Sequence, residues 1–453
     1  MSATSAALTP TEVAQTASLA SHVLKAVAGS ERNDALTAIH THLKANRDAI
    51  LEANKKDMDA ARTQVNAGKL STSLLNRLDL SKPGKWEDML DGILQVSALP
   101  DPVGNITLAT RLDTGLDLYR VTSPIGVLLV IFEARPEVIA NIAALALKSG
   151  NAVILKGGKE SSHSFAAIAA VVSKALATTP IPSGAVQLVE SREEVNALLA
   201  QDKYIDLVIP RGGNELVRYI KDHTKIPVMG HADGLCAIYL HGDADIEKSI
   251  RVIVDSKTDY PSACNAVETL LVNGSTLTTL WPQIAKALID KKVQLLCDPR
   301  SLAALESTSI LVASTVPLPK ASKDEDYHTE FLDLTLAVKT VDTFDQAITH
   351  INTHSSGHTD AILTEDKNLA EDFFRKVDSA GVYWNASTRF ADGFRYGFGT
   401  EVGISTNKIH ARGPVGLEGL MIYKYVMRGS GQVASEFGSG DGKKKFLHEK
   451  IAY

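Results

Sequence analysis

Several features of common protein classes are scarce in this sequence of 453 residues. It has three cysteines, Cys236, Cys264 and Cys297, and so sparse and odd a set argues against a disulfide framework and indicates a reducing compartment. Its longest apolar runs, residues 125–132 and 139–147, fall far short of the ~18–20 residues that a membrane-spanning helix needs. We therefore expect no disulfides and no association with a membrane.

Basic charge is not in excess either. Lys and Arg total 47 and Asp and Glu total 53, which gives a net charge of −6, whereas a nucleic-acid-binding surface needs a clustered basic excess. The first thirty residues contain one lysine and no arginine, whereas transit peptides are rich in arginine and signal peptides begin with basic residues. These absences predict a cytoplasmic protein that binds no nucleic acid.

The remaining composition is that of an ordinary globular protein. With 44% hydrophobic and 22% charged residues, the chain can bury a sizeable core, and its length corresponds to about three domains of roughly 150 residues each. Apolar residues recur at three- and four-residue steps from about residue 11 to 97, which predicts helices. Residues 106–122 change to a shorter period around a Gly-containing turn, which predicts a β-hairpin.

Short apolar strands then alternate with helical segments. We expect strands at 126–132, 152–155, 186–189 and 206–209, and again at 237–240, 267–272, 293–296, 334–338, 361–363 and 381–383. Such alternation is typical of right-handed βαβ units and a parallel sheet. A β-rich run at 419–427 closes the series. The sequence thus predicts two α/β domains in succession.

One of the three cysteines lies in a context suited to chemistry. Cys264 follows Pro261 in a loop directly before a predicted buried strand, where its sulfur can be held rigidly towards a cleft. A thiol with the ordinary pKa of ~8.5 is mostly protonated at neutral pH unless its site lowers that value. Two interpretations remain open, a nucleophile and a small buried apolar residue. Cys236 and Cys297 lie inside apolar runs, and we interpret them as core residues.

Two strand ends are candidates for nucleotide binding, because ligands of open α/β sheets bind beyond the carboxyl ends of the strands. A helix that begins after a glycine pair can also present free N–H groups to a pyrophosphate. The residues concerned are Lys156, Gly158 and Lys159 after one strand, and Gly212, Gly213 and Asn214 after another. A solvated lysine and an ordinary glycine loop are the alternatives, and neither segment is a G-x-G-x-x-G fingerprint.

A third segment contains three histidines. His350 and His354 stand four apart on a predicted helix, a spacing compatible with a metal. The sequence Ser-Ser-Gly breaks the helix before His358, so the three rings cannot share one face. We therefore predict no metal site and leave the roles of these histidines open.

Four ordered motifs carry a resemblance to a known family. They are Phe-Glu-Ala-Arg-Pro at 132–136, Lys-Ser-Gly-Asn at 148–151, Tyr-Pro-Ser-Ala-Cys-Asn-Ala-Val-Glu-Thr at 260–269, and a histidine-containing run from Val341 to Ile362. Over about residues 12–430 the chain resembles the aldehyde dehydrogenase superfamily, and within it most closely the gamma-glutamyl phosphate reductase family. The last motif is that family's own signature.

The resemblance implies a fold and a division into domains. It implies an aldehyde dehydrogenase-like α/β fold, with a Rossmann-type nucleotide-binding domain at 1–105 and 123–234 and an α/β catalytic domain at 235–410. A small β oligomerisation element at 106–122 and 411–453 completes it. A homo-oligomer, either a dimer or a tetramer, is implied as well.

The resemblance also assigns roles to residues. Cys264 matches the family's nucleophile, and Lys156 matches the lysine that contacts the adenosine ribose. Residues 212–214 match the segment that binds the pyrophosphate, and Glu330 matches the carboxylate that contacts the nicotinamide ribose. His231 stands where hydrolytic relatives keep a water-activating glutamate, and Glu133 stands where they keep an oxyanion-binding asparagine. Asn141 is the remaining side-chain candidate for the oxyanion. The expected substrate contacts are Arg135, Asn265, Asn385 and Arg389, with Arg135 the first choice for the phosphate unless it pairs with Glu133 or Glu137.

The implied activity is reduction of L-glutamyl 5-phosphate to L-glutamate 5-semialdehyde through a cysteine thioester, the second step of proline biosynthesis from glutamate. NADPH is expected over NADH because Lys156 and Lys159 lie where a 2′-phosphate would sit, although Glu160 is nearby. Two alternatives stay open: an aldehyde-oxidising dehydrogenase of the same superfamily, and an inactive scaffold for glutamate 5-kinase. Association of an active enzyme with that kinase is a further possibility.

Overall fold

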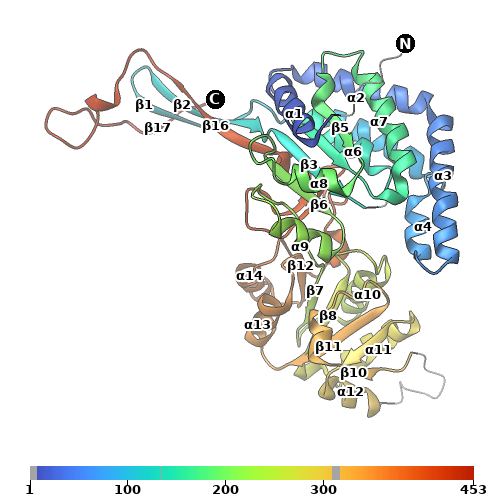
Figure 1. The fold of residues 1–453 in the computed structure, drawn as a ribbon. Helices are drawn as coiled ribbons and strands as arrows, with labels where there is room; N and C mark the ends of the chain where they lie inside the picture. The colour runs from blue at the N-terminus through green and yellow to red at the C-terminus, as the bar shows by residue number, and fades with distance from the viewer. Residues whose placement is uncertain (1–7, 134, 309–316) are drawn as a thin grey trace.

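Five helices open the chain in the computed structural model, which describes residues 8–133, 135–308 and 317–453 (Figure 1). They are α1 (Pro10–Leu24), α2 (Gly29–Ala45), α3 (Arg47–Asn66), α4 (Thr72–Leu78) and α5 (Lys85–Ala98). The first begins at a capping box, since the Thr9 hydroxyl accepts from the Glu12 N–H while the Glu12 carboxylate accepts from the Thr9 N–H. Helix α1 packs directly on the first of two parallel sheets, whereas α2, α3 and α5 pack on the helices that connect its strands.

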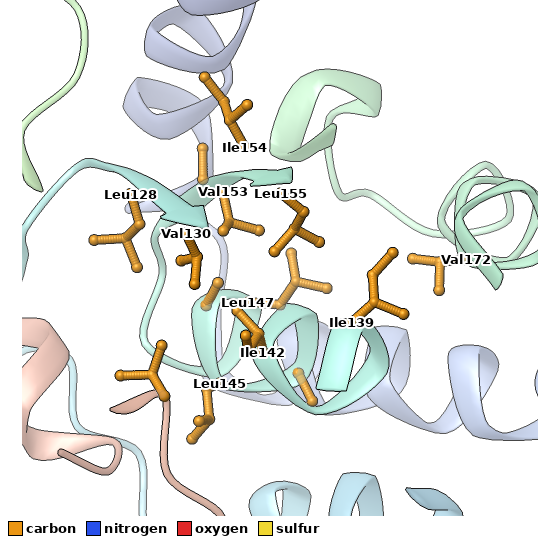
Figure 2. Packing of buried hydrophobic residues seen from close by; sticks show 14 of the residues in the cluster. Leu128, Val130, Ile139, Ile142, Leu145, Leu147, Val153, Ile154, Leu155 and Val172 are labelled. Carbon is orange, nitrogen blue, oxygen red and sulfur yellow. The ribbon is translucent and has the colours of Figure 1, made fainter. Parts of the chain in front are cut away.

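The first sheet has four parallel strands in the order β5-β4-β3-β6. They are β3 (Val127–Phe132), β4 (Ala152–Lys156), β5 (Val186–Val189) and β6 (Leu207–Arg211), connected through α6 (Val138–Lys148), α7 (Ser162–Leu176) and α8 (Arg192–Leu198). Every residue of β3 is buried because helices cover both faces of the sheet. Figure 2 shows apolar side chains of β3 and β4 packed against those of α6.

The second sheet has seven parallel strands in the order β10-β9-β11-β8-β7-β12-β13. They are β7 (Cys236–Leu240), β8 (Val267–Asn273), β9 (Gln294–Cys297), β10 (Lys320–Ala321), β11 (Thr335–Val341), β12 (Thr359–Leu363) and β13 (Gly381–Trp384). Its helices are α10 (Ile246–Thr258), α11 (Trp281–Asp290), α12 (Pro299–Glu306), α13 (Phe344–His354) and α14 (Lys367–Lys376). The helix α9 (Asn214–Asp222) lies between the two sheets in the sequence.

A β arm projects from the half that contains the first sheet (Figure 1). Its antiparallel strands follow the order β16-β2-β1-β17, with β1 (Ile106–Asp113), β2 (Leu116–Pro124), β16 (Met421–Arg428) and β17 (Glu449–Lys450). The β1–β2 turn contains Gly115 at φ +70°, a left-handed conformation that glycine adopts without steric cost. The predicted hairpin and the predicted strand at 419–427 therefore pair in one sheet.

The predicted fold class is confirmed, and each strand predicted for the two α/β parts is present within a few residues. Four short strands were not predicted: β10, β17, and the antiparallel pair β14 (Gly403–Ser405) and β15 (Gly413–Val415). The apolar core of the first sheet also contains Val402, which falls in the predicted catalytic part, and Val415, Leu417 and Leu420, which fall in the predicted oligomerisation element. Among the described helices, none has the length and apolarity required to cross a bilayer.

Candidate active site

A cavity of about 490 Å³ lies where the carboxyl ends of β3 and β6 meet the loop before β8. Phe132 and Glu133 reach it from the end of β3, and Arg211 from the end of β6. Cys264 lines it from the opposite half. A parallel sheet places ligands beyond the carboxyl ends of its strands, so this cavity is the candidate active site.

Cys264 sits in a tight turn between α10 and β8. The Ala263 N–H donates to the Tyr260 carbonyl at 3.1 Å, and the Ala266 N–H donates to the Ala263 carbonyl at 2.9 Å. Gly234 passes so close that a Cβ there would lie 2.5 Å from the Cα of Cys264, and the buried Cys236 thiol donates to the Cys264 carbonyl at 3.4 Å. Cys264 is partly exposed at the cavity, whereas Cys236 and Cys297 are buried in the core as predicted.

The surroundings of Cys264 keep its thiol protonated. Burial among protein atoms, followed by the carboxylates of Glu401 and Glu330, raises the pKa of Cys264 to about 12, while Arg211 opposes this shift. The Arg211 guanidinium also forms an ion pair with Glu401, in which Nη2 lies 3.8 Å from Oε1. The cavity therefore contains a neutral thiol rather than a ready-made thiolate.

Two histidines flank the sulfur. His358 Nε2 is 3.3 Å from Cys264 Sγ, and the His231 ring meets the His358 ring edge-on at 5.5 Å between centroids. Burial lowers the pKa of His358 to about 3 and also lowers that of His231, so both rings are neutral near pH 7. One potential ligand atom from each of the three residues lies within 4.8 Å of the others, a spacing that a thiophilic metal also fits.

His358 is a site residue that sequence reasoning left without a role. It lies 94 residues from Cys264 along the chain, and only the pairing of β12 with β7, beside β8, brings the two together. The neighbouring His350 and His354 instead stack on each other at 4.0 Å on α13 and are not among the residues that line the cavity.

The residues at the end of β6 that were predicted to bind the cofactor leave room for a pyrophosphate. Gly213 caps α9, and a Cβ added there would meet no atom within 4 Å, so the backbone is open to a ligand. A Cβ at Gly212 would instead lie 2.9 Å from the carboxyl carbon of Glu133. Asn214 donates its amide N–H to Asp233. Gly212 and Gly213 line the cavity, as does Glu330, whose carboxylate accepts from the Gly234 N–H.

The lysine candidates lie away from the cavity, at the end of β4. The Lys156 ammonium donates to the Gly157 carbonyl at 2.5 Å, and burial lowers the pKa of Lys156 while Glu160 opposes that shift. Gly157 has to be glycine because a Cβ would overlap the Phe165 ring at 1.8 Å. Gly158 caps the short 3₁₀ helix that begins at Lys159.

Four arginines line the cavity: Arg77, Arg135, Arg211 and Arg389. Arg389 is held by Asp259 at 3.2 Å and by the Asn265 amide oxygen. Arg135 makes no salt bridge to the carboxylates of the described residues, because Glu137 pairs with Lys85 at 3.3 Å instead. Arg77 was not predicted; α4 brings it to the cavity, and its Nε is buried with no partner in the described part of the chain.

Three polar residues predicted to act in the site make contacts within the protein itself. Asn265 lines the cavity, but its amide donates to the carbonyls of Arg389 and Ala391 and so holds that loop in place. The Asn385 side chain, directly after β13, accepts from the Thr364 N–H at 3.1 Å, directly after β12. Asn141 lies against Gly92 of α5, where a Cβ would come within 2.8 Å of its amide oxygen. Neither Asn385 nor Asn141 is among the residues that line the cavity, and their proposed roles in the reaction stay predictions. Ala134 of the 132–136 motif lies outside the described residues.

Comparison with known proteins places this site in a family. The sequence model of the aldehyde dehydrogenase family matches residues 3–299 and 283–401. A gamma-glutamyl phosphate reductase of Saccharomyces cerevisiae is 53% identical over 449 residues, which cover 97% of this chain and 97% of that protein. The chain belongs to the gamma-glutamyl phosphate reductases of the aldehyde dehydrogenase family.

Solved structures agree with this assignment. The crystal structure of gamma-glutamyl phosphate reductase from Thermotoga maritima aligns with a TM-score of 0.88 at 37% identity, covering 94% of this chain and 99% of that one. An engineered glycolyl-CoA reductase with bound NADP⁺ aligns with a TM-score of 0.64 at 16% identity, covering 92% and 96%, and shows the common fold. The matched family is one of dehydrogenases, which use a nicotinamide cofactor.

Proposed function

We propose that this chain reduces L-glutamyl 5-phosphate to L-glutamate 5-semialdehyde, releasing phosphate, as the second step of proline biosynthesis from glutamate. The gamma-glutamyl phosphate reductases to which it belongs support this assignment. The observation that carries it is a partly exposed cysteine thiol in a cavity lined by four arginines. An acyl phosphate that also bears a carboxylate is an anionic substrate, and such a lining suits it.

The proposed reaction passes through a thioester. Cys264 Sγ attacks the acyl carbon of the substrate, and the bond to the phosphate oxygen breaks. The Cys264 backbone N–H is the simplest donor to the oxyanion that develops on the acyl oxygen. When bound, the reduced nicotinamide supplies the hydride that brings the thioester to the aldehyde level. Glu330 at the cavity wall and the open backbone of Gly213 are the chain's own groups for holding that cofactor.

Arg135 and Arg77 are our assignment for the substrate phosphate. Both line the cavity, and neither forms a salt bridge within the described residues, so their charges are not already neutralised. Arg389 and Arg211 are each partly neutralised by a carboxylate. A planar guanidinium matches a phosphate with two parallel hydrogen bonds.

A test of the thioester compares two cysteines. In the reverse direction, glutamate 5-semialdehyde should reduce NADP⁺ over repeated turnovers only when phosphate is present to release the thioester. Cys264→Ser should retain its fold and nucleotide affinity and lose nearly all of this activity, because a hydroxyl is a much weaker nucleophile than a thiol. Cys297→Ser, in the buried core of the second sheet, should keep its turnover. Substantial activity in Cys264→Ser would contradict the thioester.

The cofactor proposed is NADPH. Lys156 and Lys159 supply two cations at the end of β4, and Arg192 of α8 acts on Lys156 as a third nearby positive charge. The carboxylates of Glu160 and Glu194 offset part of this positive charge. The measurement is kcat/KM with NADPH and with NADH, first for the native chain and then for Lys156→Ala. Native preference for NADPH that falls in the variant supports the assignment, and equal use of the two cofactors by the native chain refutes it.

Two features favour this reaction over the alternatives. An aldehyde-oxidising enzyme needs a base to activate the water that hydrolyses the thioester, and position 231 is His rather than Glu. An inactive kinase scaffold would not need a cysteine thiol at the cavity, and substrate protection of Cys264 against alkylation would exclude that role. We propose no resident metal, because an ion at His231, Cys264 and His358 would occupy the nucleophile.

The β arm is the proposed surface of assembly. The outer edge of β16 and its exposed Tyr423, Tyr425 and Met427 suit pairing with a second copy of the chain, so we propose a homo-oligomer, a dimer or a tetramer, formed through the arm. Three free cysteines among the described residues fit a cytoplasmic location. Association with glutamate 5-kinase stays a proposal that co-purification would test.

A further inference from the structure

The thiol of Cys264 has a close polar neighbour in the buried imidazole of His358. The two atoms that face each other, Sγ and Nε2, are 3.3 Å apart, within hydrogen-bond distance for sulfur. His358 is 1% exposed and lies behind the sulfur, since it is not among the residues that line the cavity. A ligand can therefore approach the sulfur without displacing this ring.

The contact of the other ring nitrogen is compatible with the tautomer in which Nε2 accepts from the thiol. His358 Nδ1 is 2.9 Å from the Thr359 hydroxyl oxygen. If Nδ1 carries the ring proton and donates it to that oxygen, Nε2 keeps its lone pair towards the sulfur and accepts from the thiol. Gly381 of β13 leaves room for the hydroxyl, because a Cβ there would lie 2.9 Å from it. Both hydrogen bonds are satisfied by the same tautomer.

A rigid turn holds the ring in this position. The buried Asp360 carboxylate accepts from the Ala237 N–H at 2.6 Å and from the Ser355 hydroxyl at 2.8 Å. Gly357, at φ +72°, allows the chain to turn between them. The Leu235 N–H donates to the Ser356 hydroxyl at 2.9 Å, so the turn is also tied to the chain that enters β7. His358 thus has little freedom to move away from Cys264.

At rest the two groups form a neutral pair. Burial raises the pKa of Cys264 to about 12 and lowers that of His358 to about 3, with His231 as the second cause for His358. The other charged groups that act on the thiol are Glu401, Glu330 and Arg211. A preformed thiolate–imidazolium pair is therefore disfavoured, and the thiol has to lose its proton during the attack itself.

Resting on the thioester chemistry proposed above, we infer that His358 is a catalytic residue that takes the Cys264 proton during the attack and later returns it. As the S–C bond forms and the C–O bond to phosphate breaks, the S–H proton moves to Nε2. The departing phosphate takes a proton from water. After hydride has reached the acyl carbon, the S–C bond breaks to give the aldehyde, and Nε2 returns its proton to the sulfur.

Each proton and charge in this cycle is accounted for. One acyl phosphate, one hydride donor and one solvent proton give one aldehyde, one oxidised cofactor and hydrogen phosphate, and both side chains end as they began. A weakly basic ring suffices because the S–H proton becomes far more acidic once the sulfur has begun to bond to carbon. General base catalysis of this kind typically contributes about 10²–10⁴-fold in rate.

The first test is the burst of NADPH formed when enzyme is mixed with glutamate 5-semialdehyde and NADP⁺ in phosphate-free buffer. The native chain should give one NADPH per active site. His358→Gln, which can accept a hydrogen bond but cannot take up a proton, should give the same amplitude about 10²-fold more slowly. The matched control is His354→Gln on α13, outside the cavity lining, which should keep the native rate.

A second variant tests the same role if His358→Gln does not fold. Thr359→Val keeps the ring and the side-chain shape but removes the hydroxyl that fixes the tautomer, so its burst should also be slower than native. A native burst rate in a folded His358→Gln, or in Thr359→Val, would overturn the role of His358. Absence of any burst from the native chain would instead refute the thioester, so the two proposals fail in different ways.

Discussion

At the scale of single residues, the cavity combines the proposed nucleophile with surroundings that do not ionise it. Cys264 is flanked by the carboxylates of Glu401 and Glu330 and by one guanidinium, Arg211. Many reactive cysteines sit in electropositive sites that lower the thiol pKa, and this one does the opposite. A protonated thiol is less open to oxidants, so its reactivity is reserved for a bound acyl group and for the proton acceptor behind it.

The pH dependence of alkylation should reveal this protonated state. Because the Cys264 pKa is raised to about 12, the thiolate fraction, and with it the rate of reaction with iodoacetamide, should rise about tenfold per pH unit from pH 6 to 9. Mass spectrometry of the modified peptide measures this rate, with Cys264→Ser as the control. A plateau reached below pH 7 would show a preformed thiolate and contradict the neutral pair.

His231 should control whether the thioester is open to water. It lines the cavity with its Nδ1 3.2 Å from the Ile404 carbonyl, a bond that orients the ring. His231→Glu would place a carboxylate base near the sulfur, so glutamate 5-semialdehyde should be oxidised to glutamate without added phosphate. The measurement is the amount of glutamate formed in phosphate-free buffer. An amount no higher than that formed by the native chain would show that position 231 does not control hydrolysis of the thioester by water.

At the scale of secondary-structure elements, the short helix α4 brings a cation to the cavity from the N-terminal region. The Ser71 hydroxyl accepts from the Leu74 N–H at 3.1 Å to cap it, and Leu78 packs with Met58 and Ala61 of α3. Arg77 follows from this placement, with its Nε buried and unpartnered among the described residues. A buried guanidinium nitrogen with no partner is costly unless a ligand satisfies it.

Removing this arginine should weaken substrate binding more than cofactor binding. Arg77→Ala should raise the KM for phosphate in the reverse reaction roughly tenfold or more, since a charge-assisted hydrogen bond contributes about 1.5–3 kcal/mol, and leave the KM for NADP⁺ nearly native. Arg62→Ala is the control, because Arg62 on α3 pairs with Asp59 at the surface. Equal effects on both KM values would argue against a phosphate contact.

The elements also show what sequence can predict. The strands β3, β4, β7 and β8 are buried apolar runs bounded by glycine or polar residues, and such runs can be recognised locally. The two-residue strands β10 and β17 carry no such pattern, since the pairing partner alone defines them. A site role for Cys264 could be predicted because the loop and the strand that position it are adjacent to it in the sequence. Arg77 and His358 could not, because their meeting with Cys264 depends on contacts between segments distant in sequence.

At the scale of the whole molecule, the β arm leaves apolar and aromatic side chains of β16 exposed. Tyr423 and Tyr425 are 55% and 59% exposed and lie edge-on to each other at 5.7 Å. Tyr425→Asp should shift the assembly towards smaller species, because a charge at a paired sheet surface opposes association. Light scattering after size exclusion measures the mass, with Lys424→Gln on the other side of the strand as the control. An unchanged mass would exclude this face of β16 from the interface.

One amide joins the arm to the rest of the molecule. Asn151, fully buried, accepts from the Gly126 N–H at 2.7 Å just after β2 and donates to the Leu420 carbonyl at 2.9 Å just before β16. Both roots of the arm are thereby fastened to the half that contains the four-stranded sheet. In an assembly joined through its arms, that half becomes the fixed frame. The chain crosses to the seven-stranded half near residues 229–236 and 391–402, and Lys408 and Arg412 add ion pairs to Asp378 across the boundary. Any movement of the seven-stranded half against that frame would have to bend the chain at these two crossings and break the ion pairs to Asp378.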